Sequence, residues 1–237
     1  MNACSYINVI IPVYNEEKYI FKTIDETTNV LNDLCLQYKV LVVNDGSVDK
    51  TTDEINRYIL LNKNDNIIVI NNQNNRGKGY SIREGLKHVN QGIIIIQDSD
   101  LEYSPEDYPR LIDPIIKKKA DVVYGSRFKG SEPKRVLYFT HLLANKYLTT
   151  LSNIFTGLNL SDMETCYKVF KYDVIKKIEL KENRFGFEPE ITSKLSKVKD
   201  IRIFEVGISY NGRRYSDGKK IKFRDALWTF LCILKYH

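Results

Sequence analysis

Five short apolar runs dominate the first half of the sequence, and each leads into a segment with the spacing of a helix. The runs are INVIIPV, KVLVVN, NIIVI, IIIIQD and ADVVYGSR, at residues 7–13, 39–44, 66–70, 93–98 and 120–127. Apolar runs without polar alternation are typical of strands that are buried on both faces. Their alternation with helices predicts an α/β fold, a Rossmann-like, mostly parallel sheet with helices on both faces.

The second half of the sequence has a different pattern. We expect a long helix over residues 136–156, another helix within 184–198 and a further strand over 201–210. No repeat, low-complexity tract or linker rich in proline and glycine separates the halves. We therefore expect a single domain over residues 1–237, in which residues 128–237 form a C-terminal elaboration on the half formed by residues 1–127.

Polar side chains gather where the predicted strands end. In a parallel sheet with helices on both faces, ligands bind outside the carboxyl ends of the strands. We expect the following residues to share that edge: Tyr14, Glu16, Asp45, Asp98, Asp100, Ser126 and Arg127.

Asp98 and Asp100 close the isoleucine run and lie one residue apart. On a strand they would point to the same face, where their charges repel each other. A divalent cation, Mg²⁺ or Mn²⁺, would turn this repulsion into coordination, with substrate phosphate oxygens completing its shell. The alternative is a polar turn in which one aspartate caps the next helix.

Basic residues that suit phosphates are also present. Lys78 lies in the RGKG stretch, Arg127 follows a strand, and residues 213–224 hold six basic residues against one acid. A solvated basic face is the alternative interpretation of this last segment. The chain has neither GxxxxGK[ST] nor GxGxxG, which argues against a P-loop enzyme or a dinucleotide oxidoreductase.

Cysteine spacing and hydropathy bear on location. Cys4, Cys35, Cys166 and Cys232 show no metal-ligand spacing, so we interpret them as free thiols in a reducing cytoplasm. No run approaches the ~20 apolar residues that span a bilayer, and no signal peptide is indicated. We expect a cytoplasmic protein, peripheral at the membrane face.

Taken together and in this order, the motifs of the chain resemble those of inverting family 2 glycosyltransferases of the GT-A fold. Within that family the sequence is similar to the dolichyl- and polyprenyl-phosphate hexose synthases. The motifs that carry the resemblance are IPVYNEE, VVNDGSVDKT, NRGKGYSIREGL, IIQDSDLEYSPED, VVYGSR, DMETCYKVF, RFGFEPEI and EVGISYNGRRYSDGKKIKFRDAL.

The resemblance implies roles for individual residues. It implies a donor that is a UDP-sugar or GDP-mannose, with uridine slightly favoured, and a Mg²⁺ or Mn²⁺ cofactor. Lys78 would lie near the nucleotide, and Arg127 would meet a phosphate. The nucleotide site would hold Pro12, Tyr14, Glu16, Asp45, which contacts the base, and Asp98. The metal ligands would be Asp98 and Asp100, with Glu102 as a third ligand where the family has Gln. Asn44 departs from the family pattern, in which many members carry Asp.

The acceptor determines which other residues are needed. A phosphate monoester is largely dianionic at neutral pH, so transfer to polyprenyl phosphate needs cations rather than a strong base. The candidates are Arg127, Arg135, Arg213, Arg214, Lys219 and Lys220. A hydroxyl acceptor would need a general base, for which Asp162 and Glu164 are candidates. Their alternative role is at a helix N-terminus, paired with basic residues.

The C-terminal segment KFRDALWTFLCILKYH combines an apolar block with basic residues at both ends. This pattern is typical of an amphipathic helix in a membrane interface, although packing on the core or in a homodimer contact is the alternative. The sequence thus favours transfer of a hexose to polyprenyl phosphate at a membrane surface, without a nucleic-acid partner. Three other functions stay open: transfer to a saccharide hydroxyl in polysaccharide synthesis, nucleotidyl transfer, and non-catalytic nucleotide binding.

Overall fold

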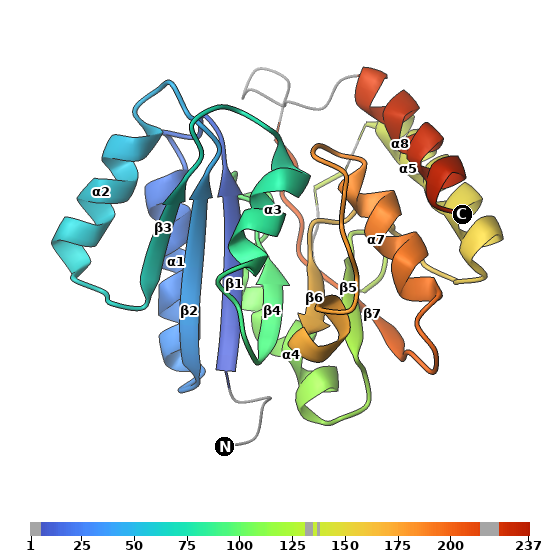
Figure 1. Ribbon diagram of the computed structural model, residues 1–237, viewed down its shortest axis with the longest axis horizontal. Helices are drawn as coiled ribbons and strands as arrows, with labels where there is room; N and C mark the ends of the chain where they lie inside the picture. Colours follow the sequence, from blue (N-terminus) through green and yellow to red (C-terminus); the bar gives the residue numbers. More distant parts are fainter. Residues whose placement is uncertain (1–5, 131–134, 137, 214–222) are drawn as a thin grey trace.

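The computed structural model describes residues 6–130, 135–136, 138–213 and 223–237, with the side chains of 223–225 excepted. The described chain forms a seven-stranded sheet in the order β3-β2-β1-β4-β6-β5-β7 (Figure 1). The strands are β1 Tyr6–Val13, β2 Gln37–Asn44, β3 Ile67–Asn71, β4 Ile93–Ile96, β5 Val122–Ser126, β6 Lys168–Lys171 and β7 Ile203–Gly207. The predicted α/β class is confirmed.

Strand direction divides the sheet. β1 pairs in parallel with β2 and β4, β2 with β3, and β5 with β7. β6 is antiparallel to both of its neighbours, β4 and β5. The sequence analysis missed β6, because its four residues begin and end with lysine and show no apolar run.

Helices cover both faces of the sheet. In Figure 1, α3 lies in front of the sheet and α1 behind it, while α5, α7 and α8 stand together at one end. The helices are α1 Ile20–Asp33, α2 Thr51–Asn62, α3 Lys78–Leu86, α4 Tyr108–Ile116, α5 Phe139–Thr156, α6 Tyr172–Ile175, α7 Phe187–Ser196 and α8 Phe223–Tyr236. None of the helices in the described residues is both long and apolar enough to cross a membrane.

The core lies where the central strands meet the helices. All four isoleucines of β4 are buried, as are Ile7 and Val9 to Ile11 of β1, which explains the absence of polar alternation. Gly85 lets α3 approach β1 closely, since a Cβ there would lie 2.7 Å from Cγ2 of Ile10. Loss of apolar surface from water at this junction stabilises the fold.

Strand β4 ends sooner than the sequence predicted. It stops at Ile96, so Asp98 and Asp100 lie in the following turn and not on the strand. The side chain of Gln97 fixes this turn: its amide donates to the carbonyls of Asp98 and Tyr103, and its oxygen accepts from two buried tyrosines. Leu101 adopts a positive φ of 59°, which turns the chain away from the strand direction.

Candidate functional site

The carboxyl edge of the sheet brings residues from four strands together. Glu16 follows β1, Asp45 follows β2, Asp98 and Asp100 follow β4, and Arg127 follows β5. The backbone N–H of Glu16 donates to Oγ1 of Thr51 at 2.8 Å, which ties the first loop to α2. This edge is therefore the candidate site, where parallel sheets bind ligands.

The two aspartates each face a cation. Nζ of Lys78 lies 2.9 Å from Oδ1 of Asp98 and 3.1 Å from Oε1 of Glu188. Glu188 also pairs with the fully buried Lys168. Asp100 instead meets Arg213, whose Nη2 lies 2.8 Å from Oδ2. Opposite charges thus alternate from the site into the core, which compensates for the cost of burial.

The two carboxyl groups differ in acidity. Burial raises the pKa of Asp98, but the positive charge of Lys78 outweighs it and holds this pKa below its ordinary value. Burial together with the negative charges of Asp98 and Glu102 raises the pKa of Asp100 to about 7. The structure thus leaves Asp100 short of positive charge.

This donor set fits a divalent cation. Two carboxylates from one turn, separated by a single residue, supply the hard oxygen ligands that Mg²⁺ and Mn²⁺ prefer, and a cation beside Asp100 would relieve the repulsion that raises its pKa. Among the described residues, no three His, Cys, Asp or Glu side chains are arranged to hold a metal ion. Substrate oxygens and water would have to complete the shell.

Glu102 already has protein partners. Oε2 accepts from the hydroxyl of Tyr210 at 2.6 Å, and Oε1 accepts from the backbone N–H of Arg213 at 2.7 Å. Its predicted role as a third metal ligand stays a prediction. In this structure its carboxylate joins the turn after β4 to the segment after β7.

Asp45 holds the RGKG loop. Its oxygens accept from the backbone N–H groups of Arg76 and Gly77, and from the side chain of Asn72. Gly77 adopts φ 103°, and a Cβ there would lie 2.5 Å from the carbonyl oxygen of Asn183, so only glycine fits. The contact of Asp45 with a base stays a prediction.

Asn44, where the sequence analysis noted a departure from the family pattern, is the last residue of β2. Its amide donates to Thr52 and Asn71, and its oxygen accepts from the N–H of Ser47. An uncharged side chain serves as both donor and acceptor here, as an aspartate could not.

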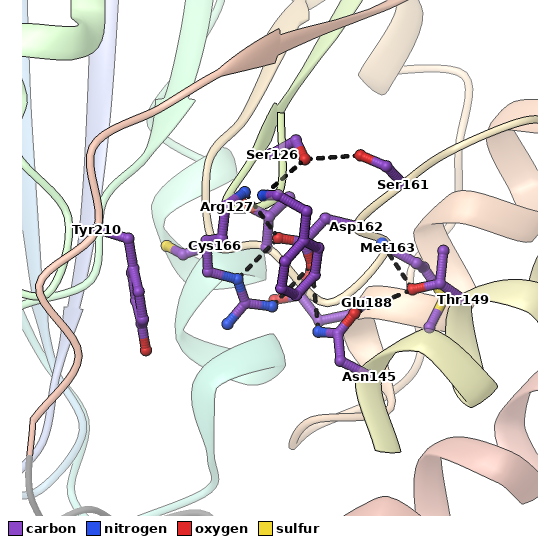
Figure 2. Close-up of polar contacts among 12 residues, drawn as sticks. Ser126, Arg127, Asn145, Thr149, Ser161, Asp162, Met163, Cys166, Glu188 and Tyr210 are labelled. Carbon is purple, nitrogen blue, oxygen red and sulfur yellow. Dashed lines mark hydrogen bonds and ion pairs between the residues drawn. The ribbon is translucent and has the colours of Figure 1, made fainter. Parts of the chain in front are cut away.

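Arg127 is fixed by a buried carboxylate. Its Nε and Nη2 lie 2.7 Å from the two oxygens of Asp162, and its backbone N–H donates to Asp162 at 3.0 Å (Figure 2). Asn145 reaches from α5 to the same carboxylate at 3.2 Å. Burial opposes ionisation of Asp162, but Arg127 holds its pKa below the ordinary value. An acid so firmly paired is poorly suited to accept a proton from a substrate.

Glu164 has the opposite character. Its Oε1 is buried and has no hydrogen-bond partner among the described residues. Burial and the negative charge of Glu188 raise its pKa to about 7. The two predicted candidates for a general base thus differ sharply.

The other predicted residues fall in three places. Pro12 lies in β1 next to Val43, and Tyr14 lies in the loop that follows β1. Arg135 donates from Nη1 to the carbonyl of Gly212 at 2.5 Å, beside Arg213. Arg214, Lys219 and Lys220 lie outside the described residues. The sequence analysis assigned no role to Gln97 or Glu188 and considered Lys168 only as a basic partner of Asp162 and Glu164, because only the pairing of distant segments reveals their contacts.

Comparison with protein families gives a clear match. The family model described as "Glycosyl transferase family 2" matches residues 8–179, most of the chain. The chain belongs to glycosyl transferase family 2. It is a glycosyltransferase, and the resemblance seen in its motifs is confirmed.

This glycosyltransferase is similar to several curated proteins. A dolichyl-phosphate beta-glucosyltransferase of Trichomonas vaginalis is 29% identical over 93% of this chain and 69% of its own length. A dolichol-phosphate mannosyltransferase of Pyrococcus furiosus is 27% identical over 91% of this chain, which spans 60% of that relative.

A solved structure shares the GT-A fold. The glucosyl-3-phosphoglycerate synthase of Mycobacterium tuberculosis, in complex with Mn²⁺, UDP-glucose and phosphoglyceric acid, superimposes with a TM-score of 0.75 at 16% identity. The match covers 98% of this chain and 79% of that chain.

The contrast between Asp162 and Glu164 predicts opposite effects of the same chemical change. Asp162→Asn leaves buried Arg127 without its counter-charge and should lower the free energy of unfolding by about 3–5 kcal/mol. Glu164→Gln removes the charge of a carboxyl group whose Oε1 lacks a partner among the described residues, and should leave stability unchanged or raised. Urea unfolding at pH 7.5 measures both, and equal losses would contradict the contrast.

The raised pKa of Asp100 predicts a pH dependence of stability. The folded protein binds this proton more tightly than the unfolded chain does, so the free energy of unfolding should fall as pH rises from about 4 to 7. Asp100→Asn should abolish the contribution of Asp100 to this fall in the free energy of unfolding, which we expect to be at least about 1 kcal/mol. Unfolding in metal-free buffer at several pH values tests this. Asp113→Asn on α4, at an exposed carboxylate, is the matched control and should keep the fall.

Proposed function

We propose that this glycosyltransferase moves a hexose from a UDP-sugar or GDP-mannose to polyprenyl phosphate, with inversion at the anomeric carbon. The observation that carries the proposal is that α5 links Arg127, the predicted phosphate ligand, to an exposed apolar surface. Its inner side supplies Asn145 to the Arg127–Asp162 pair, and its outer side exposes apolar side chains. A lipid phosphate has this same combination of an anionic head and an apolar tail.

The names of the relatives support the same acceptor class. The curated relatives include enzymes named for dolichyl phosphate, dolichol phosphate and undecaprenyl phosphate. They differ in the sugar that their names give, so they do not choose between donors. We keep both the uridine and the guanosine donor.

On the donor side, Asp98 and Asp100 would hold a divalent cation. When bound, that ion would neutralise charge that develops on the departing diphosphate. Lys78 keeps Asp98 ionised, and Glu188 keeps Lys78 in place. Asp45 holds the loop of residues 76–77, which shapes the wall of the predicted nucleotide site.

On the acceptor side, Arg127 would receive the phosphate. Its guanidinium is oriented by two bonds to Asp162 and lies 5.3 Å from the ring centre of Tyr210. A guanidinium fixed in this way loses little conformational entropy on binding a phosphate. The phosphate is already dianionic at neutral pH and attacks without a base.

We also propose that the exposed apolar side chains of α5 and α8 lie against the membrane; we call them the α5–α8 face. They are Phe139, Leu143, Tyr147, Ile154, Leu227, Trp228, Leu231 and Leu234. Lys146 and Lys235 flank them, and α5 contains no acidic residue. Aromatic and basic residues around an apolar surface suit a helix in the interface of an anionic bilayer.

α8 is also anchored to the protein, through buried residues on its inner side and through polar groups of Trp228 and Lys235 at the margin of the face. Cys232 and Ile233 are buried, and Glu182 accepts from Nε1 of Trp228, from Nζ of Lys235 and from the hydroxyl of Tyr236. The alternative that α8 packs on the core thus describes its inner side. The outer side remains for the membrane.

Glu164 favours a second candidate function, transfer to a saccharide hydroxyl. A carboxyl group with a buried oxygen that has no hydrogen-bond partner among the described residues, and with a pKa near 7, suits a general base. The apolar surface beside the site favours the lipid phosphate over this alternative.

An acceptor assay should separate the two functions. With Mn²⁺ and a panel of nucleotide sugars, we expect product with polyprenyl phosphate and none with free sugars or polyprenol. Glu164→Gln should cost less than about tenfold in rate, since general-base catalysis typically contributes ~10²–10⁴-fold. Transfer to sugar hydroxyls that Glu164→Gln abolishes would refute the phosphate acceptor.

Vesicle binding should depend on the α5–α8 face. Wild-type protein should cosediment with phosphatidylglycerol vesicles, and the double change Leu143→Glu and Leu231→Glu should weaken binding by about tenfold or more. Leu60→Glu on α2, at a leucine that is more exposed and lies at the other end of the sheet, is the control (Figure 1). If the double variant instead turns a dimer into a monomer and leaves vesicle binding unchanged, the face is a dimer contact.

A further inference from the structure

The two cations at the paired aspartates are held in different ways. Lys78 has a second carboxylate, Glu188, which lies outside the pair and is itself bound to buried Lys168. Lys78 therefore keeps a partner in the core whatever happens at Asp98. Because Glu188 holds it from the core side, Lys78 is a fixed part of the site.

Within the described part of the chain, the charge of Arg213 has no such anchor. Its guanidinium contacts Glu16 at 3.1 and 3.2 Å, Asp100 at 2.8 Å, and Glu102 at 3.7 Å. All three carboxylates belong to the candidate donor site. Its remaining described contact is the ring of Tyr19, 5.3 Å from the guanidinium carbon.

The hydrogen-bonding capacity of the Arg213 side chain is also not fully used by the described residues. Its Nε is buried and has no hydrogen-bond partner among the described residues. A buried donor of a charged group without a partner is costly, and an additional anion would remove that cost. The three carboxylates that surround the guanidinium are hard oxygen donors, and such groups also bind metal cations.

Arg213 and a divalent cation would need the same oxygen atoms. Nη2 of Arg213 bonds to Oδ2 of Asp100, one of the two predicted metal ligands. Two cations at one carboxylate repel each other, and a divalent ion brings the larger charge. Binding of one therefore opposes binding of the other.

We propose that Arg213 is the resident counter-ion of the donor site: it occupies Asp100 and Glu16 in the ligand-free enzyme and is displaced when metal and nucleotide bind. The displaced guanidinium then pairs with the phosphates that have arrived, which also satisfies Nε. This inference rests on the proposed function, because it assumes a metal and a nucleoside diphosphate. It makes Arg213 a positioning residue that couples arrival of the donor to the segment after β7.

The test measures Mn²⁺ binding to the ligand-free enzyme by electron paramagnetic resonance, without acceptor or turnover. Arg213→Gln removes the competitor and should tighten Mn²⁺ binding by about tenfold. Arg213→Lys keeps the charge but loses the fork that bridges two carboxylates, so it should also bind Mn²⁺ more tightly than wild type. Arg57→Gln, at an exposed arginine on α2, has the same change of net charge and should bind as wild type does.

The outcomes distinguish this inference from the proposed function. Weaker Mn²⁺ binding by both Arg213 variants would overturn the inference, because Arg213 would then assist the metal. Equal binding by wild type and Arg213→Lys would also overturn it, because only the field of the charge would matter. If wild type binds no Mn²⁺ even with UDP or GDP present, the metal-dependent function itself fails.

Discussion

Buried negative charge at the carboxyl edge of the sheet is the constraint on which the rest of the site depends. Four carboxylates lie close together there, on the turn after β4 and the loop after β1, and water screens their charges poorly. They are Asp98, Asp100, Glu102 and Glu16. Lys78 from α3 and Arg213 from the segment after β7 compensate this negative charge. Each cation comes from a different part of the chain, so neutralising the site also joins its two halves.

The same principle recurs at Arg127. Asp162 compensates its charge, with Asn145 of α5 as an additional donor. The two clusters differ in how well their carboxylates are neutralised. Asp162 is paired through both oxygens and its pKa lies below the ordinary value, whereas the pKa of Asp100 is raised by burial and by the negative charges of Asp98 and Glu102. An additional cation would therefore be favoured beside Asp100 and not beside Asp162.

The sequence predicted the first five strands and the site edge because both depend on local pattern. Apolar runs indicate buried strands, and polar residues directly after them must lie at one edge. The bounds of β4 were wrong: the sequence placed Asp98 on the strand, but Gln97 turns the chain before it. No local signal reveals that Gln97 meets Tyr108 and Tyr167, because those partners follow from tertiary packing.

Strand β6 runs against its neighbours, and this reversal has a consequence for how such a site is assembled. A strand that runs parallel to β1 brings to the carboxyl edge only the residues that follow it in the sequence. An antiparallel strand brings the residues that precede it, so the segment before Lys168 lies at the same edge although its chain direction is opposite. One inverted strand thereby brings Asp162, which precedes it, to the edge where Arg127 follows the oppositely directed strand β5.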